Sequence, residues 1–127
     1  MTGQLKSDFR DLDVWQKCRE IRIIIWKLCK KFPAEEKFRL SDQMIRASRS
    51  STANIAEGYG RFHFQENIQF CRQSRGSLFE LIDHVLVAEE CEYIDRDEKE
   101  KLIEHIISAI RLLNGYIKYL STRRDNT

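Results

Sequence analysis

The chain has 127 residues, of which 42% are hydrophobic and 33% charged, so it is long enough for one domain with a buried core. A single proline and five glycines are too few for a β-sandwich or barrel, in which a turn recurs about every ten residues, and this predicts an all-α fold. The net charge of +2 and the pI of about 8.4 fall short of the pI of about 9 that is typical of a dedicated nucleic-acid-binding domain.

Two polar tails flank a predicted four-helix domain over residues 9–121. Residues 1–8 and 122–127 are polar, and we expect both to be disordered. The N-terminal residues lack the apolar core of a signal peptide, and no apolar run exceeds four residues, whereas a membrane span needs about 18. We therefore expect a cytoplasmic protein with no membrane partner.

The first helix is predicted over residues 13–31, with Asp13 as its N-cap and Gln16 completing a capping-box-like pair. Phe32-Pro33 ends it, because proline cannot continue a helix and restricts the residue before it. Apolar side chains recur along it at steps of three and four, which is the period of one buried stripe. The stripe comprises Val14, Cys18, Ile21, Ile25, Leu28 and Phe32.

The second and third helices are predicted over residues 41–57 and 64–91. The second is rich in small side chains, which permit close approach of a neighbouring helix. Gly76 lies inside the third at a cost of about 1 kcal/mol relative to alanine, so we expect another part of the protein to pack closely against it. The short connections between helices predict antiparallel neighbours and an up-down-up-down four-helix bundle.

The most specific stretch of the chain is Ala-Asn-Ile-Ala-Glu-Gly-Tyr-Gly-Arg, over residues 53–61. Its two glycines can take positive φ at no steric cost, which suits a helix end and a tight reversal. We assign its polar residues to a helix-end hydrogen bond or a subunit contact, not to catalysis. The turn-motif residues are Asn54, Glu57, Gly58, Tyr59 and Gly60.

The fourth helix is predicted over residues 95–120, beginning with a capping box of Asp95 and Glu98. At about 100° per residue its apolar side chains cover an arc of about 240°, whereas a surface helix of a monomeric bundle needs little more than about 100°. The excess favours a second buried contact and hence a homo-oligomer. The alternative is that this helix is simply the most enclosed of the four.

The sequence contains no recognisable catalytic or metal-binding motif. The Glu-x-x-His of di-iron bundles is absent, the four cysteines and three histidines lack zinc-ligand spacing, and the glycines lack the setting of a P-loop. We expect reduced, structural cysteines, and His105 as a satisfied core or interface histidine. The sequence therefore predicts no enzymatic activity, no metal and no cofactor.

Charge is distributed unevenly along the chain. Residues 37–75 carry seven basic and three acidic side chains, whereas residues 76–104 carry three basic and ten acidic ones. This asymmetry indicates opposed charged surfaces, for self-association or for an anionic partner.

The basic side chains in and around the motif are the candidate nucleic-acid contacts. Antiparallel packing would bring the arginines of the second and third helices to one end of the molecule, with Tyr59 and Phe62 exposed nearby, and this pattern suits phosphate contact and base stacking. The alternative is that the arginines pair with the acidic stretch over residues 89–104, within a subunit or across an interface. The candidates are Arg46, Arg49, Arg61, His63, Arg72 and Arg75.

Five segments of the chain resemble, in order and spacing, the four-helix bundle family of 23S rRNA intervening-sequence proteins. They are Phe9-Arg-Asp-Leu-Asp-Val-Trp-Gln16, the motif over residues 53–61, Arg75-Gly-Ser-Leu78, Tyr93-Ile94 and Leu113-Asn-Gly115. Many members carry Ile-Pro directly before the motif, where this chain has Ser51-Thr52.

The resemblance implies an up-down bundle that assembles as a homopentamer around a central channel, and a family without established enzymatic activity. A more distant similarity, to the accessory variability protein of diversity-generating retroelements, implies binding to nucleic acid and to a nucleic-acid-processing protein. We therefore expect a non-catalytic homo-oligomer that binds rRNA or another structured nucleic acid, or a ribonucleoprotein. The alternative is a protein–protein interaction scaffold with no direct nucleic-acid contact.

Overall fold

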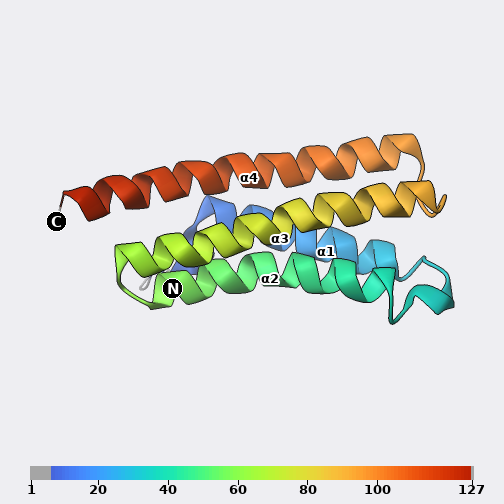
Figure 1. Cartoon of the computed structure of the whole chain (residues 1–127), viewed down its shortest axis with the longest axis horizontal. Helices are drawn as coiled ribbons and strands as arrows, with labels where there is room; N and C mark the ends of the chain where they lie inside the picture. The colour runs from blue at the N-terminus through green and yellow to red at the C-terminus, as the bar shows by residue number, and fades with distance from the viewer. Residues whose placement is uncertain (1–6, 127) are drawn as a thin grey trace, which may run out of the picture.

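A computed structural model describes residues 7–126, and within this range the chain is all-α, as the composition predicts. Four long helices follow one another, α1 (Asp13–Cys29), α2 (Leu40–Gly60), α3 (Phe64–Glu90) and α4 (Arg96–Asp125) (Figure 1). Short 3₁₀ helices η2 (Phe9–Asp11) and η3 (Ala34–Glu36) precede α1 and α2. The predicted tail over residues 1–8 lies mostly outside the described residues.

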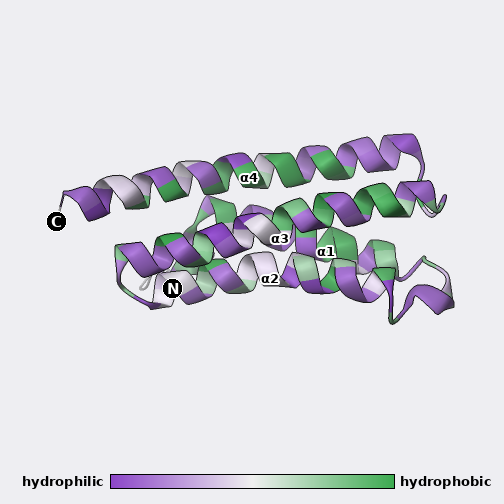
Figure 2. Cartoon of the chain, viewed as in Figure 1, coloured by the Kyte–Doolittle hydropathy of each residue, from purple (hydrophilic) through white to green (hydrophobic). Residues whose placement is uncertain are grey.

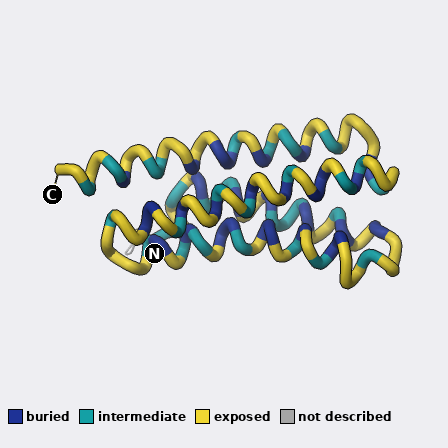
Figure 3. The backbone as a smooth tube through the Cα atoms, in the orientation of Figure 1, coloured by how far each residue is buried: buried dark blue, intermediate teal, exposed yellow. Residues whose placement is uncertain are grey.

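The four helices lie side by side along the long axis of the molecule. Helix α1 packs against α2 and α4, and α3 packs against the same two helices, so that α1 and α3 stand diagonally across the core. Apolar residues alternate with polar ones along each helix (Figure 2), and the buried positions recur once per turn (Figure 3). The largest fully buried side chains include Ile21, Ile25, Met44, Ile55, Ile68, Leu78, Leu81, Ile106 and Leu113.

The sequence predicts the N-caps of α1 and α4, and the structure agrees with the prediction at α4 only. Asp95 accepts a hydrogen bond from the Glu98 backbone at 2.8 Å, and Glu98 Oε1 accepts one from the Asp95 backbone at 3.2 Å, which confirms the capping box of α4. At α1 the predicted N-cap is wrong. Leu12 takes that position without a side-chain bond, Asp13 is the first residue of the helix, and Gln16 Nε2 donates to the carbonyl of Arg10 at 2.9 Å.

The turn between α2 and α3 differs from the prediction at both glycines. Helix α2 continues through Gly58 to Gly60, and among the described glycines none has positive φ; Phe62 takes the left-handed conformation instead, at φ 60°. Gly58 is needed for packing, since a Cβ there would lie 2.7 Å from Asn67 Oδ1. The expected close packing at Gly76 is wrong, because nothing lies within 4 Å of a Cβ built there.

Helix α4 extends five residues beyond its predicted end at Leu120, so the expected disorder after residue 121 is wrong as far as Asp125. Its last turn is held by α3, because Arg124 Nη1 donates to Gln65 Oε1 at 2.6 Å. The alternative that α4 is the most enclosed helix is also wrong, since Ile107, Leu112 and Tyr119 are exposed. Across the described residues we find no helix with the length and apolar character of a membrane span.

Candidate nucleic-acid interface

The structure spreads the candidate arginines along the bundle. Ser74 Oγ donates to the Ser51 carbonyl at 2.8 Å, and Gly58 lies against Asn67, so these contacts run in opposite order along α2 and α3. Arg46 of α2 precedes Arg61, the residue directly after α2, by 15 residues. This spacing is about 22 Å along the helix axis at about 1.5 Å per residue. The prediction that the arginines gather at one end is therefore wrong.

Arg46 and Arg49 lie in the first half of α2, away from the turn. Arg46 is exposed and forms a long ion pair with Asp42 at 3.9 Å. The Arg49 guanidinium lies over the ring of Trp26 on α1, 5.4 Å from its centroid. Arg49 thus covers an aromatic side chain in a cation–π contact.

Arg75 and Arg72 lie on the side of α3 next to α4. Arg75 Nη1 donates to Asn114 Oδ1 at 2.7 Å and so links the two helices. Arg72 is exposed and has no ion pair within residues 7–126. Neither residue pairs in this chain with the acidic stretch over residues 89–104, so the intramolecular form of that alternative is wrong for them.

At the turn itself, Arg61 is held by carboxylates of both adjoining helices. Its Nη2 atom lies 2.9 Å from Glu57 Oε2, its Nη1 atom lies 4.0 Å from Glu66 Oε2, and its guanidinium lies 5.1 Å from the Phe70 ring centroid. His63 is exposed at the start of α3 and makes no side-chain cap. These contacts fix the position of Arg61 and leave the imidazole facing solvent.

Phe62 is the most exposed large apolar residue at this turn, with 86% of its surface accessible. Its positive φ is uncommon for a residue with a bulky side chain, and such strain persists only where the surroundings impose it. Tyr59, which we expected to be exposed, is only partly so, because it packs on Phe9 with ring centroids 6.5 Å apart. Of Tyr59 and Phe62, therefore, only Phe62 has a ring that is largely accessible for stacking.

Two cations that sequence reasoning missed lie beside this turn. The Arg123 guanidinium lies 5.8 Å from the ring centroids of both Phe64 and Tyr119, and Arg124 bonds to Gln65. The sequence predicts the helix only as far as Leu120, because the residues that follow it are polar and carry no apolar period. The end of α4 and the α2–α3 turn therefore lie together (Figure 1). We call Arg61, Phe62, His63, Tyr119, Arg123 and Arg124 the turn-end cluster.

The motif's remaining polar residue has a structural partner on its own helix. Asn54 Nδ2 donates to the carbonyl and the hydroxyl oxygen of Ser50, both at 2.9 Å. With Glu57 bound to Arg61 and Gly58 packed on Asn67, the motif closes the junction of α2 and α3.

This arrangement of helices and motif agrees with the comparison to protein families. The 23S rRNA-intervening sequence protein family matches residues 10–115. The chain belongs to this family. Tyr119, Arg123 and Arg124 lie beyond the matched range, so the family match does not account for this half of the turn-end cluster.

A solved structure agrees with the family assignment. It is the crystal structure, at 1.70 Å resolution, of a protein with unknown function from the S23 ribosomal protein family of Bacteroides thetaiotaomicron VPI-5482. The two chains share 26% sequence identity with a TM-score of 0.76, over 83% of this chain and 95% of that one. Comparison with curated proteins finds none that matches.

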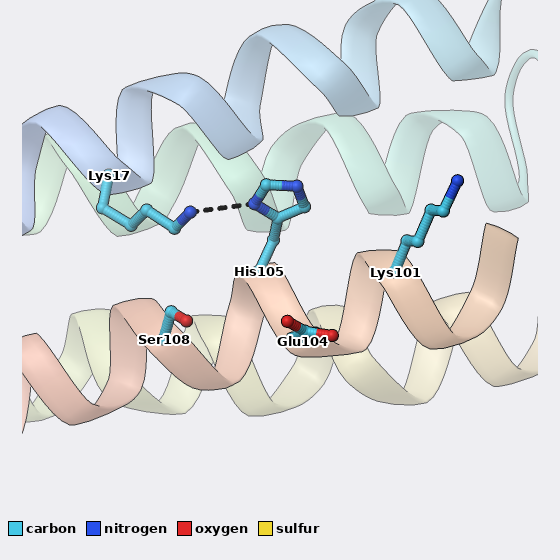
Figure 4. Close-up of a pocket in the computed structure, with 5 residues that line it drawn as sticks. All are labelled: Lys17, Lys101, Glu104, His105 and Ser108. Carbon is cyan, nitrogen blue, oxygen red and sulfur yellow. Dashed lines mark hydrogen bonds between the residues drawn. The ribbon is translucent and has the colours of Figure 1, made fainter. Parts of the chain in front are cut away.

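A small polar cavity of about 170 Å³ separates α1 from α4 in this family member (Figure 4). Lys17 Nζ of α1 lies within hydrogen-bond distance of His105 Nδ1 of α4, at 2.8 Å. Glu20 Oε1 lies 3.6 Å from both groups. Lys101, Glu104 and Ser108 complete the lining. The contact between Lys17 and His105 joins α1 to α4 across this cavity.

The three buried thiols are poor nucleophiles. Burial raises the pKa of Cys18 and of Cys29 to about 11, and that of Cys71 to about 12, so all three are protonated at neutral pH. Within the described part of the chain, no three His, Cys, Asp or Glu side chains group as a metal site would require.

Proposed function

We propose that this member of the 23S rRNA-intervening sequence protein family is a non-catalytic, cytoplasmic, ring-like homo-oligomer of up-down-up-down bundles. We propose further that it binds structured RNA, or a ribonucleoprotein, through the turn-end cluster. The observation that carries the RNA proposal is that two basic groups meet at one end of the bundle. Arg61 and His63 flank the exposed ring of Phe62 in the turn, and Arg123 and Arg124 contact Phe64 and Gln65 at the start of α3. The family resemblance supports a subunit number of five.

The chemistry of the cluster suits a single-stranded or looped RNA segment. Guanidinium groups bind phosphate oxygens, and stacking of a base on an aromatic ring contributes about 1–3 kcal/mol. The ion pairs of Arg61 with Glu57 and Glu66 are exposed, and such pairs contribute less than about 1 kcal/mol, so a phosphate can replace them. Arg72, two turns along α3 from Gln65, extends the basic surface.

A non-catalytic role is supported by the engagement of the polar groups in the core. The hydroxyls of Ser48 and Ser51 donate to carbonyls of their own helix at 3.0 and 2.7 Å, and Ser74 donates to α2. These contacts position helices, and none pairs a hydroxyl with a base that would activate it.

RNA binding can be tested by fluorescence anisotropy with a labelled hairpin from 23S rRNA. We expect the Arg61→Glu/Arg123→Glu variant to lose at least about tenfold in affinity, and the wild-type affinity to fall steeply with salt, because phosphate contacts dominate. Phe62→Ala should lose about tenfold, since it removes a stacking surface.

The matched control is Lys27→Glu/Lys31→Glu, which makes the same change in net charge on exposed residues of another part of the bundle. It should bind within about twofold of the wild type. Unchanged affinity of Arg61→Glu/Arg123→Glu, or equal losses in the control, would contradict the proposed interface.

The alternative function, a protein–protein scaffold, is favoured by one observation. Large apolar side chains are exposed far from the turn, among them Phe38 at 84% and Phe79 at 56%. A pull-down from nuclease-treated lysate separates the two proposals: a partner retained without nucleic acid supports the scaffold, and loss of all partners supports RNA binding.

A further inference from the structure

An aromatic groove opens between α1 and α2, next to their connection. It has a volume of about 560 Å³, and its apolar lining includes buried Phe32 together with Trp26, which is 42% exposed, and Phe38, which is 84% exposed. Lys30 Nζ lies 4.7 Å from the Trp26 ring centroid, with Arg49 nearby at 5.4 Å.

The rim of this groove is basic. Lys37 lies over the exposed ring of Phe38, 5.4 Å from its centroid, and joins Lys30 and Arg49 among the lining residues. Asp42 also lines the groove, but Arg46 pairs with it. The stretch over residues 27–49, which forms this part of the molecule, carries seven basic and three acidic side chains.

A ridge of apolar and acidic side chains lies on α3 and the adjoining side of α4. Its acidic groups are on α3, since Ile103 and Ile107 of α4 border an equal number of basic and acidic side chains, Lys99, Arg111, Glu100 and Glu104. Phe79, Asp83, Leu86 and Glu90 are all exposed and are spaced along one face of α3. The contacts Arg75–Asn114 and Glu89–Lys99 link the two helices at either end of this stretch, so Ile103 and Ile107 of α4 lie alongside it. We define the ridge as Phe79, Asp83, Leu86, Glu90, Ile103 and Ile107.

Groove and ridge are placed to meet between copies of the chain. Because α1 and α3 each pack against both α2 and α4, the outer side of the α1–α2 pair faces away from the outer side of the α3–α4 pair. Both surfaces lie near the end of the bundle that holds the α1–α2 and α3–α4 connections (Figure 1). Two complementary patches on opposite sides at one level form a head-to-tail contact, which closes into a ring where each copy is rotated relative to the last and otherwise extends as a filament.

We propose that the ridge of one copy packs into the groove of the next, with Phe79 and Leu86 against Trp26 and Phe38. Lys30 and Lys37 of the groove then face Asp83 and Glu90 of the neighbouring copy. This inference rests on the proposed homo-oligomer and assigns its interface. Charge complementarity selects a second copy as the occupant, since the chain supplies both the basic rim and the acidic side chains of the ridge.

Charge swapping with light scattering tests the interface. Lys30→Glu/Lys37→Glu places acid against acid, and Asp83→Lys/Glu90→Lys places base against base, so each should elute as a 15.2 kDa monomer. The variant with all four substitutions restores opposite charges and should regain the wild-type mass. The control Lys27→Glu/Lys31→Glu, on exposed residues that do not line the groove, should keep that mass.

A cysteine pair tests the same contact without changing charge. Phe38→Cys/Leu86→Cys in a Cys91→Ser background substitutes exposed positions only and should give a ladder of disulfide-linked copies on oxidation. Each single cysteine should give at most a dimer.

The outcomes separate the two claims. A monomeric wild type overturns the homo-oligomer and the interface with it. An oligomeric wild type whose charge-reversed variants stay assembled, or whose fourfold variant stays monomeric while folded by circular dichroism, overturns the interface alone. Absence of the disulfide ladder does the same.

Discussion

At Gly58, a side chain of any size would collide with α3. A Cβ would lie 2.7 Å from Asn67 Oδ1 and 2.9 Å from Phe70 Cβ. Asn67 is itself fixed, because its Nδ2 atom donates to the Tyr116 hydroxyl at 3.3 Å. A Cβ built at Gly60, two residues later, has no neighbour within 4 Å. The two glycines of the motif therefore have different roles.

We predict that Gly58→Ala destabilises the protein by about 1–3 kcal/mol, as overpacking does elsewhere. Gly60→Ala is the matched control and should be neutral or stabilising by up to about 1 kcal/mol, since alanine reduces the freedom of the unfolded chain in a helical conformation. Urea unfolding of both variants measures the difference. Equal stability of the two would refute the packing role of Gly58.

The sequence predicted the need for glycine at this position but not its cause. A glycine near a helix end fits a positive φ as well as a close helix contact, and only the position of Asn67 across the junction distinguishes them. The strain lies instead on Phe62, where the residue type gives no sign of it. Such tertiary causes are not readable from one segment.

At the scale of elements, the two connections at one end of the bundle are joined by a hydrogen bond. The Tyr93 hydroxyl, between α3 and α4, donates to Glu36 Oε2 of η3 at 2.6 Å. Glu36 Oε1 also accepts from the Leu40 backbone at 3.2 Å. These bonds, that of Tyr93 first, hold the pKa of Glu36 below its ordinary 4.5, and the same carboxylate raises the pKa of Tyr93 to about 12.

These shifts predict when Tyr93→Phe should matter. The lowered pKa of Glu36 contributes stability above its ordinary value, and this is lost as the pH falls through the folded pKa. The raised pKa of Tyr93 contributes stability below 10, its ordinary value, and this is lost as the pH rises toward 12.

Tyr93→Phe should therefore lower the melting temperature most between about pH 5 and 10, with the difference from wild type shrinking at both extremes. A scan of Tm against pH by circular dichroism measures it. A difference that is independent of pH would contradict the charge-assisted bond and leave only a packing effect.

Helix positions were largely predictable and helix ends were not. The stripe Val14, Cys18, Ile21, Ile25 is buried as its period predicts, because burial of an apolar face is a local property of the sequence. The last turn of α4 is polar and is held by Gln65 and the ring of Phe64, which are distant in sequence. A contact of this kind leaves no local signal.

At the scale of the whole molecule, charge and apolar surface are arranged together. Basic side chains surround the aromatic groove on one side, acidic side chains of α3 lie on the ridge on the other, and the turn-end cluster lies at the opposite end. The uneven charge is evident in the sequence. Which arginines share one end of the bundle is not, because that depends on where each helix ends and how the helices are aligned. A ring built through groove and ridge would present several turn-end clusters on one face, and multivalency would strengthen RNA binding.

Size-exclusion chromatography with light scattering, run with and without a 23S rRNA hairpin, tests most directly the proposal that this family member is a homo-oligomer that binds RNA. We predict a mass of five times 15.2 kDa for the protein alone, and a heavier species with RNA that disappears in Arg61→Glu/Arg123→Glu. A 15.2 kDa monomer whose mass is unchanged by RNA would contradict it.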